Sequence, residues 1–535
     1  MNALTGTGKL IRLILRRDRW LLAVWVLPIS LVPQSLKSTI SAAYPTPEEL
    51  RGYYDVSVDN PGFISLYGQL PGPSLGEMVA WRIGFVPVMV GLIALLTVIR
   101  HTRTEEETGR RELVGATVVG RHAGLAAALT VTFVANLVLA VLVALFLIGQ
   151  GMPAAGSWAL GLELAAAGWV FAAVGAVAAQ LTESAGAARA IAITALGVAY
   201  LLRVVGDLSS LGNGAVSWLS WLSPIGWVHR IRPYGAEQWW VLALAAGFTA
   251  VLTVGAVALA ARRDVGAGLL PTRPGPAAAA PGLNSPLGLA WRLHRSLLAG
   301  WLVGFAVLGL VFGGVAESIG DLLNDNQGLQ DVFARIGGRA ALIDIYFAAI
   351  MSLIGIIAAG YAIQAALRLR TEESSLRAEP ILATSVSRLR WAASHYAFSV
   401  LGPAAAMVTA GLVAGLAYGI STGDAGREVP RVLGAAMVQL PAVWVLSAVA
   451  IALVGLLPRM AATGGWGALA LCLMISMIGA PLQLSQWLLD VSPFTHVPRA
   501  PGADVSAAPL VWLLVVAVAL TAAGLAGLRR RDISP

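Results

Sequence analysis

Charged residues are scarce in this chain of 535 residues. Asp, Glu, Lys and Arg together make up 12% of it, whereas 57% of the residues are hydrophobic and the mean hydropathy is +0.77. A soluble globular domain carries about twice this share of charged residues. The composition therefore excludes a soluble globular protein and indicates a chain that lies in a lipid bilayer.

Cysteine and closely spaced histidine pairs are also lacking. The single cysteine, Cys472, lies in an apolar stretch, which excludes an intrachain disulfide and favours a packed small hydrophobic side chain. The six histidines show no HxH or HxxxH spacing. We therefore expect no metal site in this chain.

Lysine occurs only at positions 9 and 37, which bears on ATP binding. The stretch TGTGKL, residues 5–10, resembles a phosphate-binding loop, but that motif needs Gly at position 3 and Ser or Thr at position 10. The chain has Ala3 and Leu10 instead. We therefore expect that this polypeptide does not bind ATP in that fashion and has no cofactor of its own.

Long apolar stretches are abundant, and each is close to the roughly 20 residues that a membrane-spanning helix needs. They predict an all-α polytopic membrane protein with about twelve transmembrane helices. The first six lie near residues 20–42, 82–100, 123–149, 157–181, 189–206 and 239–261. The second six lie near residues 297–316, 341–367, 396–420, 432–457, 464–484 and 509–528.

Basic residues cluster at both ends of the chain and in its middle. These clusters contain Lys9, Arg12, Arg16, Arg17 and Arg19, then Arg262, Arg263, Arg273, Arg292 and Arg295, and finally Arg529, Arg530 and Arg531. Because basic segments stay in the cytoplasm, both termini are expected there. The net charge of +8 then reflects topology, and we expect no nucleic-acid partner.

One charged loop occurs twice in the sequence. Residues 103–121 read RTEEETGRRELVGATVVGR and residues 370–388 read RTEESSLRAEPILATSVSR, with ten identities in nineteen positions at an offset of 267. We call these segments the first and second charged loops. Two flanking echoes occur in the same order, around Arg16 and Arg292 and in SPIGWVHR and SPFTHVPR. We interpret the chain as two parallel six-helix repeats.

The repeat predicts three parts. Residues 1–264 are the first six-helix half, residues 265–288 are a cytoplasmic linker rich in Pro, Gly and Ala, and residues 289–535 are the second half. Arginines alternate with apolar residues just before the first span of each half. This pattern favours an N-terminal helix that lies in the membrane interface, with topology signalling as the alternative.

The first charged loop carries signs of a short helix. Thr104 and Glu107 have capping-box spacing, so we expect a helix that projects Glu105, Glu106, Arg110 and Glu112 into the cytosol. In the second charged loop Pro380 stands where the first has Leu113. We expect the second helix to end a turn earlier, near Glu379.

The pattern E-E-x-x-x-R-x-E-x-x-x-A-T-x-V-x-R after the second span of a six-helix half resembles the permeases of ABC-2 type exporters. The similarity is greatest to the fused twelve-helix actinobacterial subgroup of polyketide-antibiotic exporters, and it covers essentially the whole chain. The family often has Pro in its T-P-V-S-R ending, where this chain has Val118 and Ser385, and Gly120 stands in place of the first Ser.

The resemblance implies that each loop holds a short coupling helix that contacts an ATPase subunit. The residues it assigns to coupling are Glu105, Glu106, Arg110, Glu112 and Arg121, and Glu372, Glu373, Arg377, Glu379 and Arg388. It also implies two nucleotide-binding subunits, identical or related, that carry ATP and Mg on separate chains in a bacterial plasma membrane. The alternative is a solvated loop that only sets topology, which does not explain the repeated acidic residues.

Two further sets of residues are candidates for the transport pathway. SPIGWVHRIRP and SPFTHVPRAP precede the last span of each half, and the resemblance implies an outer gate with Pro224, Arg230, Pro493 and Arg499; a Trp-anchored interfacial turn is the alternative. Within the spans, Glu163 is a candidate for the substrate pathway or the polar partner of another helix. Arg203 and Asp207, four residues apart, predict a local ion pair.

So few intramembrane charges favour a hydrophobic or amphipathic small-molecule cargo, in contact with membrane lipid. The predicted function is therefore the permease of an ATP-driven exporter, with no enzymatic activity of its own. Two alternatives stay open: a proton-coupled drug carrier, which also uses parallel six-helix halves, and a membrane-embedded lipid-linked transferase.

Overall fold

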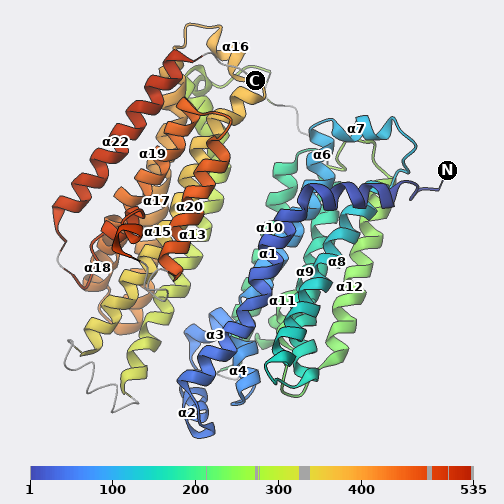
Figure 1. Ribbon diagram of the computed structural model, residues 1–535, viewed down its shortest axis with the longest axis vertical. Helices are drawn as coiled ribbons and strands as arrows, with labels where there is room; N and C mark the ends of the chain where they lie inside the picture. The colour runs from blue at the N-terminus through green and yellow to red at the C-terminus, as the bar shows by residue number, and fades with distance from the viewer. Residues whose placement is uncertain are drawn as a thin grey trace. The chain divides into compact units, whose positions relative to one another are not determined.

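The computed structural model describes residues 2–211, 214–270, 275, 277–324, 338–478, 485–503 and 505–531. The chain divides into two compact units, Met1–Gly275 and Pro276–Pro535. All regular elements in the described residues are helices, which confirms the all-α prediction (Figure 1).

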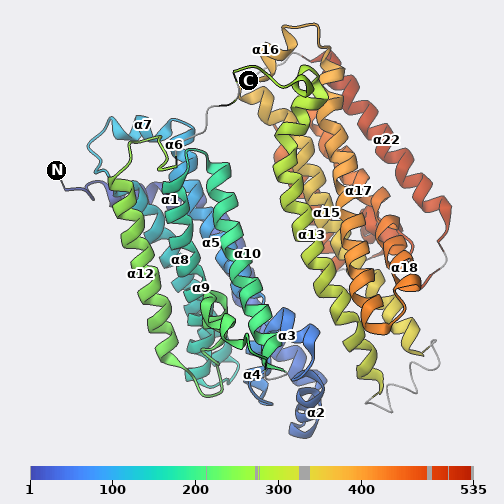
Figure 2. The same cartoon turned by 180° about the vertical axis from the view of Figure 1, so that it is seen from behind.

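The first unit is a bundle of long helices with short helices at both ends (Figure 1). Its long helices are α1 (Thr7–Ala43), α5 (Val86–Ile99), α8 (Ala123–Gly149), α9 (Ala154–Leu181), α10 (Ala185–Ser210) and α12 (Trp239–Ala261). The short ones are α2 (Pro47–Ser57), α3 (Pro61–Tyr67), α4 (Leu75–Arg82), α6 (Glu105–Glu107), α7 (Arg110–Gly115) and α11 (Pro224–His229). Figures 1 and 2 show α6 and α7 at one end of this bundle and α2, α3 and α4 at the other.

The first turns of α1 run across the end of the bundle beside α7, and the helix then bends to follow the bundle (Figure 1). At the opposite end, α2 and α4 start at capping boxes, in which Thr46 pairs with Glu49 and Ser74 with Glu77. Each box satisfies two backbone N–H groups that the first turn of a helix leaves free. These local signals fold the insertion between α1 and α5 into helices.

Small residues let the long helices of the first unit approach closely. A Cβ on Gly161 of α9 would lie 2.4 Å from the Ala140 carbonyl oxygen of α8, so only glycine fits there. Helices inside a bilayer gain their packing energy from such close contacts, because lipid chains are as apolar as the side chains. The buried leucines, valines and alanines of α5, α8 and α9 form the centre of the bundle.

The second unit is a further helical bundle (Figure 2). Its elements are α13 (Pro286–Asn324), α15 (Gly338–Ser374), α16 (Ala378–Leu382), α17 (Arg388–Thr422), α18 (Ala425–Val438), α19 (Leu440–Leu456), α20 (Ala461–Ile478), α21 (Gln486–Leu489) and α22 (Ala507–Arg530). Here α19 and α22 meet at glycines: a Cβ on Gly455 would lie 1.9 Å from the Gly524 carbonyl oxygen. The last helix is thereby held tightly against the core.

Eleven helices in the described part of the chain are long and apolar enough to cross a membrane, whereas the sequence predicted about twelve. The difference falls at the predicted span 464–484, where the apolar helix covers only Ala461–Ser476 and residues 479–484 lie outside the described residues. Positions 271–274 and 276 of the predicted linker also lie outside them. The eleven spans define a multi-pass helical membrane protein.

Candidate functional site

The first charged loop continues directly from α5 instead of starting with a cap. One turn of π-helix, Arg100–Thr104, joins α5 to α6. Gly109, with a φ of 71°, interrupts the helix before α7. The predicted capping box at Thr104 is wrong, because Thr104 is already helical and its side chain caps no N–H group. The predicted short helix is confirmed as α7, which begins six residues later.

Glu106 lies at the centre of an arginine cluster. Its Oε2 accepts hydrogen bonds from Arg103 Nη1 at 2.8 Å and Arg263 Nη1 at 2.9 Å. Its Oε1 accepts from Arg111 Nη1 at 2.6 Å and Arg263 Nη2 at 3.0 Å. The Glu106 side chain is 1% exposed. The expectation that Glu106 projects into the cytosol is therefore wrong, because three guanidinium groups enclose its carboxylate.

Arg263 connects this carboxylate to the end of α12. It follows α12 by two residues, and its Nε donates to Gln180 Oε1 on α9 at 2.8 Å. Its backbone carbonyl accepts a hydrogen bond from Arg121 Nη2 at 2.8 Å. Arg121, the last residue of the first charged loop, and Glu106 thus both bind the same residue at the end of α12.

The remaining charges of the first charged loop are more open to solvent. Glu105 Oε1 lies 2.7 Å from Arg17 Nη2 of α1 and 3.7 Å from Arg110 Nη1. Arg110 and Glu112 are exposed, as are the apolar side chains of Leu113 and Val118. Burial lowers the pKa of Arg111, although Glu106 raises it and Arg263 lowers it further. The expected projection into solvent therefore holds for Arg110 and Glu112.

The second charged loop repeats the central contacts with its own residues. Glu373 accepts two hydrogen bonds of 2.7 Å from Arg531 Nη2, and Arg370 Nη1 lies 3.5 Å from its Oε2. The Glu373 side chain is 0% exposed. Arg388 Nη1 donates to the Arg531 carbonyl at 2.8 Å. Arg531 directly follows α22, so this acid also binds at the end of a last helix.

The other residues of the second charged loop divide in the same way. Arg368 Nε donates to Glu372 Oε1 at 2.8 Å, and Arg377 lies 3.8 Å from the same atom. Glu372 is buried, whereas Arg377 and Glu379 are exposed. The expectation that the helix ends near Glu379 is wrong, because α16 begins at Ala378 and contains Pro380 in its first turn, where no N–H donor is needed.

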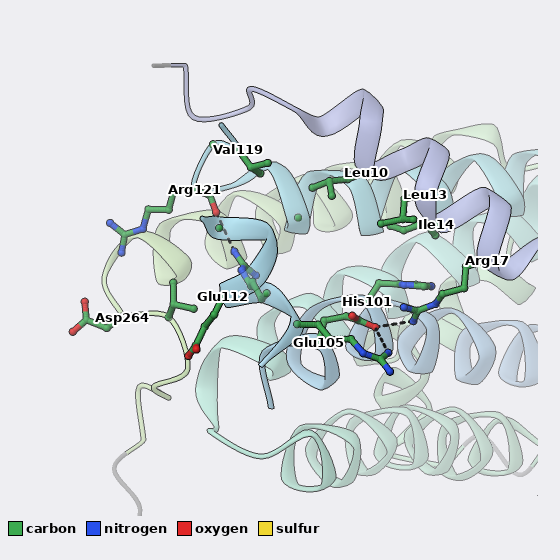
Figure 3. A pocket seen from close by; sticks show the side chains of 16 residues that line it. Leu10, Leu13, Ile14, Arg17, His101, Glu105, Glu112, Val119, Arg121 and Asp264 are labelled. Atoms are coloured by element: carbon green, nitrogen blue, oxygen red, sulfur yellow. Dashed lines mark hydrogen bonds and ion pairs between the residues drawn. The ribbon is translucent and has the colours of Figure 1, made fainter. Parts of the chain in front are cut away.

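A cavity of about 680 Å³ lies between the start of α1 and the first charged loop. Leu10, Leu13 and Ile14 of α1 line one side, and Figure 3 shows Arg17 reaching from the same helix to Glu105. The other side carries charged residues of the loop and of the segment after α12, among them Arg110, Arg111, Glu112, Arg121 and Asp264. The cavity is therefore amphipathic.

The backbone of the N-terminal segment forms hydrogen bonds with the end of the first charged loop. Gly120 N donates to the Thr5 carbonyl at 2.9 Å, and His122 N donates to the Ala3 carbonyl at 3.0 Å. A Cβ on Gly120 would lie 2.3 Å from the Ala3 carbonyl oxygen. Glycine at position 120 is thus required by the segment that passes beside it.

The outer-gate candidates of the first unit lie in a compact cap. Pro224 is the first residue of α11, where Ser223 Oγ accepts from Gly226 N at 3.1 Å. Arg230 Nη1 donates to Ser220 Oγ at 2.6 Å, and its guanidinium lies 4.4 Å from the centroid of the Trp221 ring. Burial lowers the pKa of Arg230. Figures 1 and 2 place α11 away from the end of the bundle that carries α7.

In the second unit the matching candidates differ in burial. Pro493 is buried at the start of a single turn, Pro493–His496, whereas Arg499 is exposed. Pro493 and His496 also border a cavity of about 280 Å³ beside α22. An outer gate stays a prediction for all four residues.

Glu163 is buried in α9 with 3% of its surface exposed. It makes no hydrogen bond or ion pair with any residue that the structure describes, so the polar helix partner that the sequence left open is not among them. Within the described residues, no group of three His, Cys, Asp or Glu side chains could hold a metal ion.

Sequence reasoning missed the residues that complete the two clusters. Arg263 and Arg531 were interpreted only as topology signals, and Arg103 and Arg370 were not assigned a role. His101 Nε2 also lies 2.7 Å from the buried Asp18 carboxylate of α1. The available signal was position, since Arg103 and Arg370 are identical between the loops and an arginine follows the last span of each half.

These features define the class of protein as a polytopic membrane protein whose repeated charged loops are fastened to its helices. The family model described as "Multidrug efflux system permease Rv1217c, C-terminal domain" matches residues 50–261 and 283–529. The chain is 45% identical over 533 residues to the "Multidrug efflux system permease protein Rv1217c" of Mycobacterium tuberculosis, covering 99% of this chain and 96% of that protein. The chain belongs to this family of multidrug efflux system permeases.

Proposed function

We propose that this chain is the membrane permease of an ATP-driven exporter of the ABC-2 type. It moves hydrophobic or amphipathic compounds, drug-like, antibiotic-like or lipid-like, out of the cytoplasm or the inner leaflet. Family membership and the similarity to the multidrug efflux system permease protein of Mycobacterium tuberculosis support efflux of such compounds. The resemblance to fused exporters of polyketide antibiotics narrows the proposal to a single chain that supplies both halves of the pathway.

The energy comes from separate chains in this proposal. Two nucleotide-binding subunits, identical or related, carry ATP and Mg and bind one at each charged loop. The observation that carries the proposal is that each loop is tied by matching Glu–Arg contacts to the last helix of its own unit. A loop that only sets topology needs positive charge and no such anchoring.

We further propose the topology and the transport cycle of this exporter. The two halves are parallel six-helix repeats in a bacterial plasma membrane, with both termini and both charged loops in the cytoplasm. Binding of ATP to the two subunits drives them together, moves the loops and switches the pathway from inward-facing to outward-facing. Pro224, Arg230, Pro493 and Arg499 then belong to the outer gate.

Proton-coupled transport is the second candidate, and Glu163 is the observation that favours it. A buried carboxyl group without a partner among the described residues is a possible proton carrier in a membrane-spanning helix. In that case a proton gradient replaces ATP, and Glu163→Gln abolishes transport.

Reconstitution separates the two candidates. The permease is placed in proteoliposomes with an ATPase subunit that co-purifies with it, and ethidium transport is measured with ATP or with a proton gradient alone. The proposal predicts transport that needs the ATPase subunit and ATP and that vanadate inhibits. Transport driven by the proton gradient without the ATPase subunit, and lost in Glu163→Gln, would refute it.

A further inference from the structure

Not every charge of the two loops is accessible to a partner protein. The side chains of Glu106 and Glu373 are 1% and 0% exposed, and each carboxylate points at arginines of its own unit. A subunit that docks from outside cannot reach these carboxylates without first breaking the ion pairs. Their identity in both loops therefore calls for another explanation than docking.

The two acids share two arginine contacts, and Glu106 binds Arg111 in addition. Glu106 binds the guanidinium of Arg263, and Glu373 binds that of Arg531. An arginine three residues earlier, Arg103 or Arg370, pairs with the same carboxylate at 2.8 Å or 3.5 Å.

The backbone closes each set. The arginine that ends each charged loop, Arg121 or Arg388, donates at 2.8 Å to the carbonyl of the residue whose guanidinium the acid binds. Residue 263 or 531 is thus held by its side chain and its main chain at once. We call these sets the Glu106 clasp (Arg103, Glu106, Arg121, Arg263) and the Glu373 clasp (Arg370, Glu373, Arg388, Arg531).

Burial makes each clasp rigid. Taking a carboxylate out of water is unfavourable, and the arginines offset this cost only while the geometry is kept. In the Glu106 clasp, two nitrogens of the planar Arg263 guanidinium bind the two carboxylate oxygens, which fixes its orientation. In the Glu373 clasp, both carboxylate oxygens accept from the single nitrogen Nη2 of Arg531. A displacement of the loop must therefore carry the end of α12 or α22 with it.

The solvent-facing part of each loop is a different set of residues. In the first loop Arg110, Glu112, Leu113 and Val118 are exposed, with Leu113 and Val118 at 76% and 70%. In the second, Leu376 is 51% exposed beside the exposed Arg377 and Glu379. Exposed apolar side chains rimmed by charges are typical of a protein interface.

We infer that Glu106 and Glu373 are positioning residues of the transport cycle: they transmit loop movement to the last helix of each unit, and the ATPase subunit contacts the exposed residues instead. The inference rests on the proposed function, since it needs an ATPase subunit at the loops. It changes the role of two acids from docking contacts to mechanical links. It also assigns a role to Arg263 and Arg531, which lie outside the loops.

Two substitutions of the same chemistry test the inference in the full chain. Glu373→Gln removes the buried charge, and Glu379→Gln is the matched control in the exposed part of the same loop. The measurements are the affinity of the reconstituted permease for the ATPase subunit and the ethidium transported per ATP hydrolysed. Glu373→Gln is expected to keep the affinity within about twofold and to lower transport per ATP about tenfold or more, because the loop then moves without the end of α22. Glu379→Gln is expected to weaken ATPase binding.

A double-mutant cycle with Arg531→Gln shows whether the acid acts through the arginine. If the clasp is the link, Arg531→Gln reproduces the transport defect, and the double variant is no worse than the more affected single variant. Arg531→Gln serves alone if Glu373→Gln does not fold. Hydrogen exchange at residues 523–531 gives a second measurement, which a residue that only binds the ATPase subunit would leave unchanged. Faster exchange is expected in Glu373→Gln and unchanged exchange in Glu379→Gln.

The outcomes separate the inference from the function beneath it. If wild-type permease does not bind the ATPase subunit, the proposed function fails and the inference fails with it. If wild type binds but Glu373→Gln loses affinity while Arg531→Gln transports normally, Glu373 is a docking residue and only the inference is overturned.

Discussion

Arg203 shows how a charged side chain is kept inside a membrane-spanning helix. It is fully buried in α10, and its Nη1 donates to the Ile64 carbonyl at 2.7 Å, with Leu66 3.4 Å from Nη2. These carbonyls lie in the last turn of α3, where a helix supplies few N–H donors; the Ile64 carbonyl also accepts a hydrogen bond from Gly68 N at 2.9 Å. The predicted ion pair with Asp207 is long, at 3.9 Å. The sequence correctly predicted a charged Arg203 within a membrane-spanning helix. It could not show that Arg203 donates its hydrogen bonds to the end of α3, which is far away in the sequence.

His229, the last residue of α11, is half-buried, and its surroundings determine its charge. Its Nε2 lies 2.9 Å from the Gly84 carbonyl, which fits a neutral ring that donates from this nitrogen. Burial, with a smaller contribution from Arg203, lowers the pKa of His229 from 6.5 to about 3. The unfolded chain therefore binds a proton more readily than the folded one.

This shift predicts a loss of stability in acid. The contribution of His229 is fully present above about pH 6.5 and falls by up to about 1.4 kcal/mol per pH unit as the pH drops toward 3. Thermal unfolding in detergent between about pH 7 and pH 4 measures it. His229→Gln, which keeps a donor for Gly84, is expected to flatten this dependence, and His496→Gln, an exposed histidine, is the control. An unchanged slope in His229→Gln would contradict the assignment.

At the scale of elements, the charged loops show what the sequence could and could not predict. Their existence, position after the second span and short helical content follow from local patterns, because charge and turn residues interrupt apolar stretches there. The burial of Glu106 does not follow, since it depends on Arg263, which lies 157 positions away. The prediction of a cap at Thr104 is wrong for a related reason. The helix α5 continues through a π-turn into α6, so no new helix begins at Thr104 and no free N–H groups need a cap there.

The contact between the N-terminal segment and the first charged loop gives a prediction for an element. Gly120→Ala places a methyl group against the Ala3 carbonyl, so residues 2–6 must move away. In this variant, hydrogen exchange is expected to become faster at the backbone amides of residues 120 and 122, which donate hydrogen bonds to this segment. Gly115→Ala is the matched control, since a Cβ there meets no atom within 4 Å. Equal exchange in both variants would show that the segment does not restrain the loop.

At the scale of the whole molecule, the membrane class followed from composition alone, and most spans from apolar length. The span count differs from the prediction because the apolar stretch of α20 is too short in the described residues. The span Ala425–Leu456 is counted once, as predicted, but it consists of two helices, α18 and α19. Apolar length does not reveal such a break. The division into two compact units at Gly275 and Pro276 is a property of the fold.

The orientation of the chain is open to a direct labelling experiment. Cys472 is the only cysteine and is buried, so Cys472→Ala gives a background free of thiols. Single cysteines at the exposed positions Ala155 and Ala503 are expected to react with a membrane-impermeant maleimide in intact cells. Cysteines at the exposed positions Ala116 and Ser375, in the charged loops, are expected to react only after permeabilisation. The reverse pattern would contradict a cytoplasmic location of the loops.

The central claim is that separate ATPase subunits drive this permease through its two charged loops. A cryo-electron microscopy structure of the permease with its ATPase subunits bound tests it most directly. The account predicts one subunit on each loop, in contact with Leu113 and Val118 in the first and with Leu376 and Glu379 in the second, while Glu106 and Glu373 stay paired with Arg263 and Arg531. ATPase subunits seated elsewhere, with both loops bare, would contradict it.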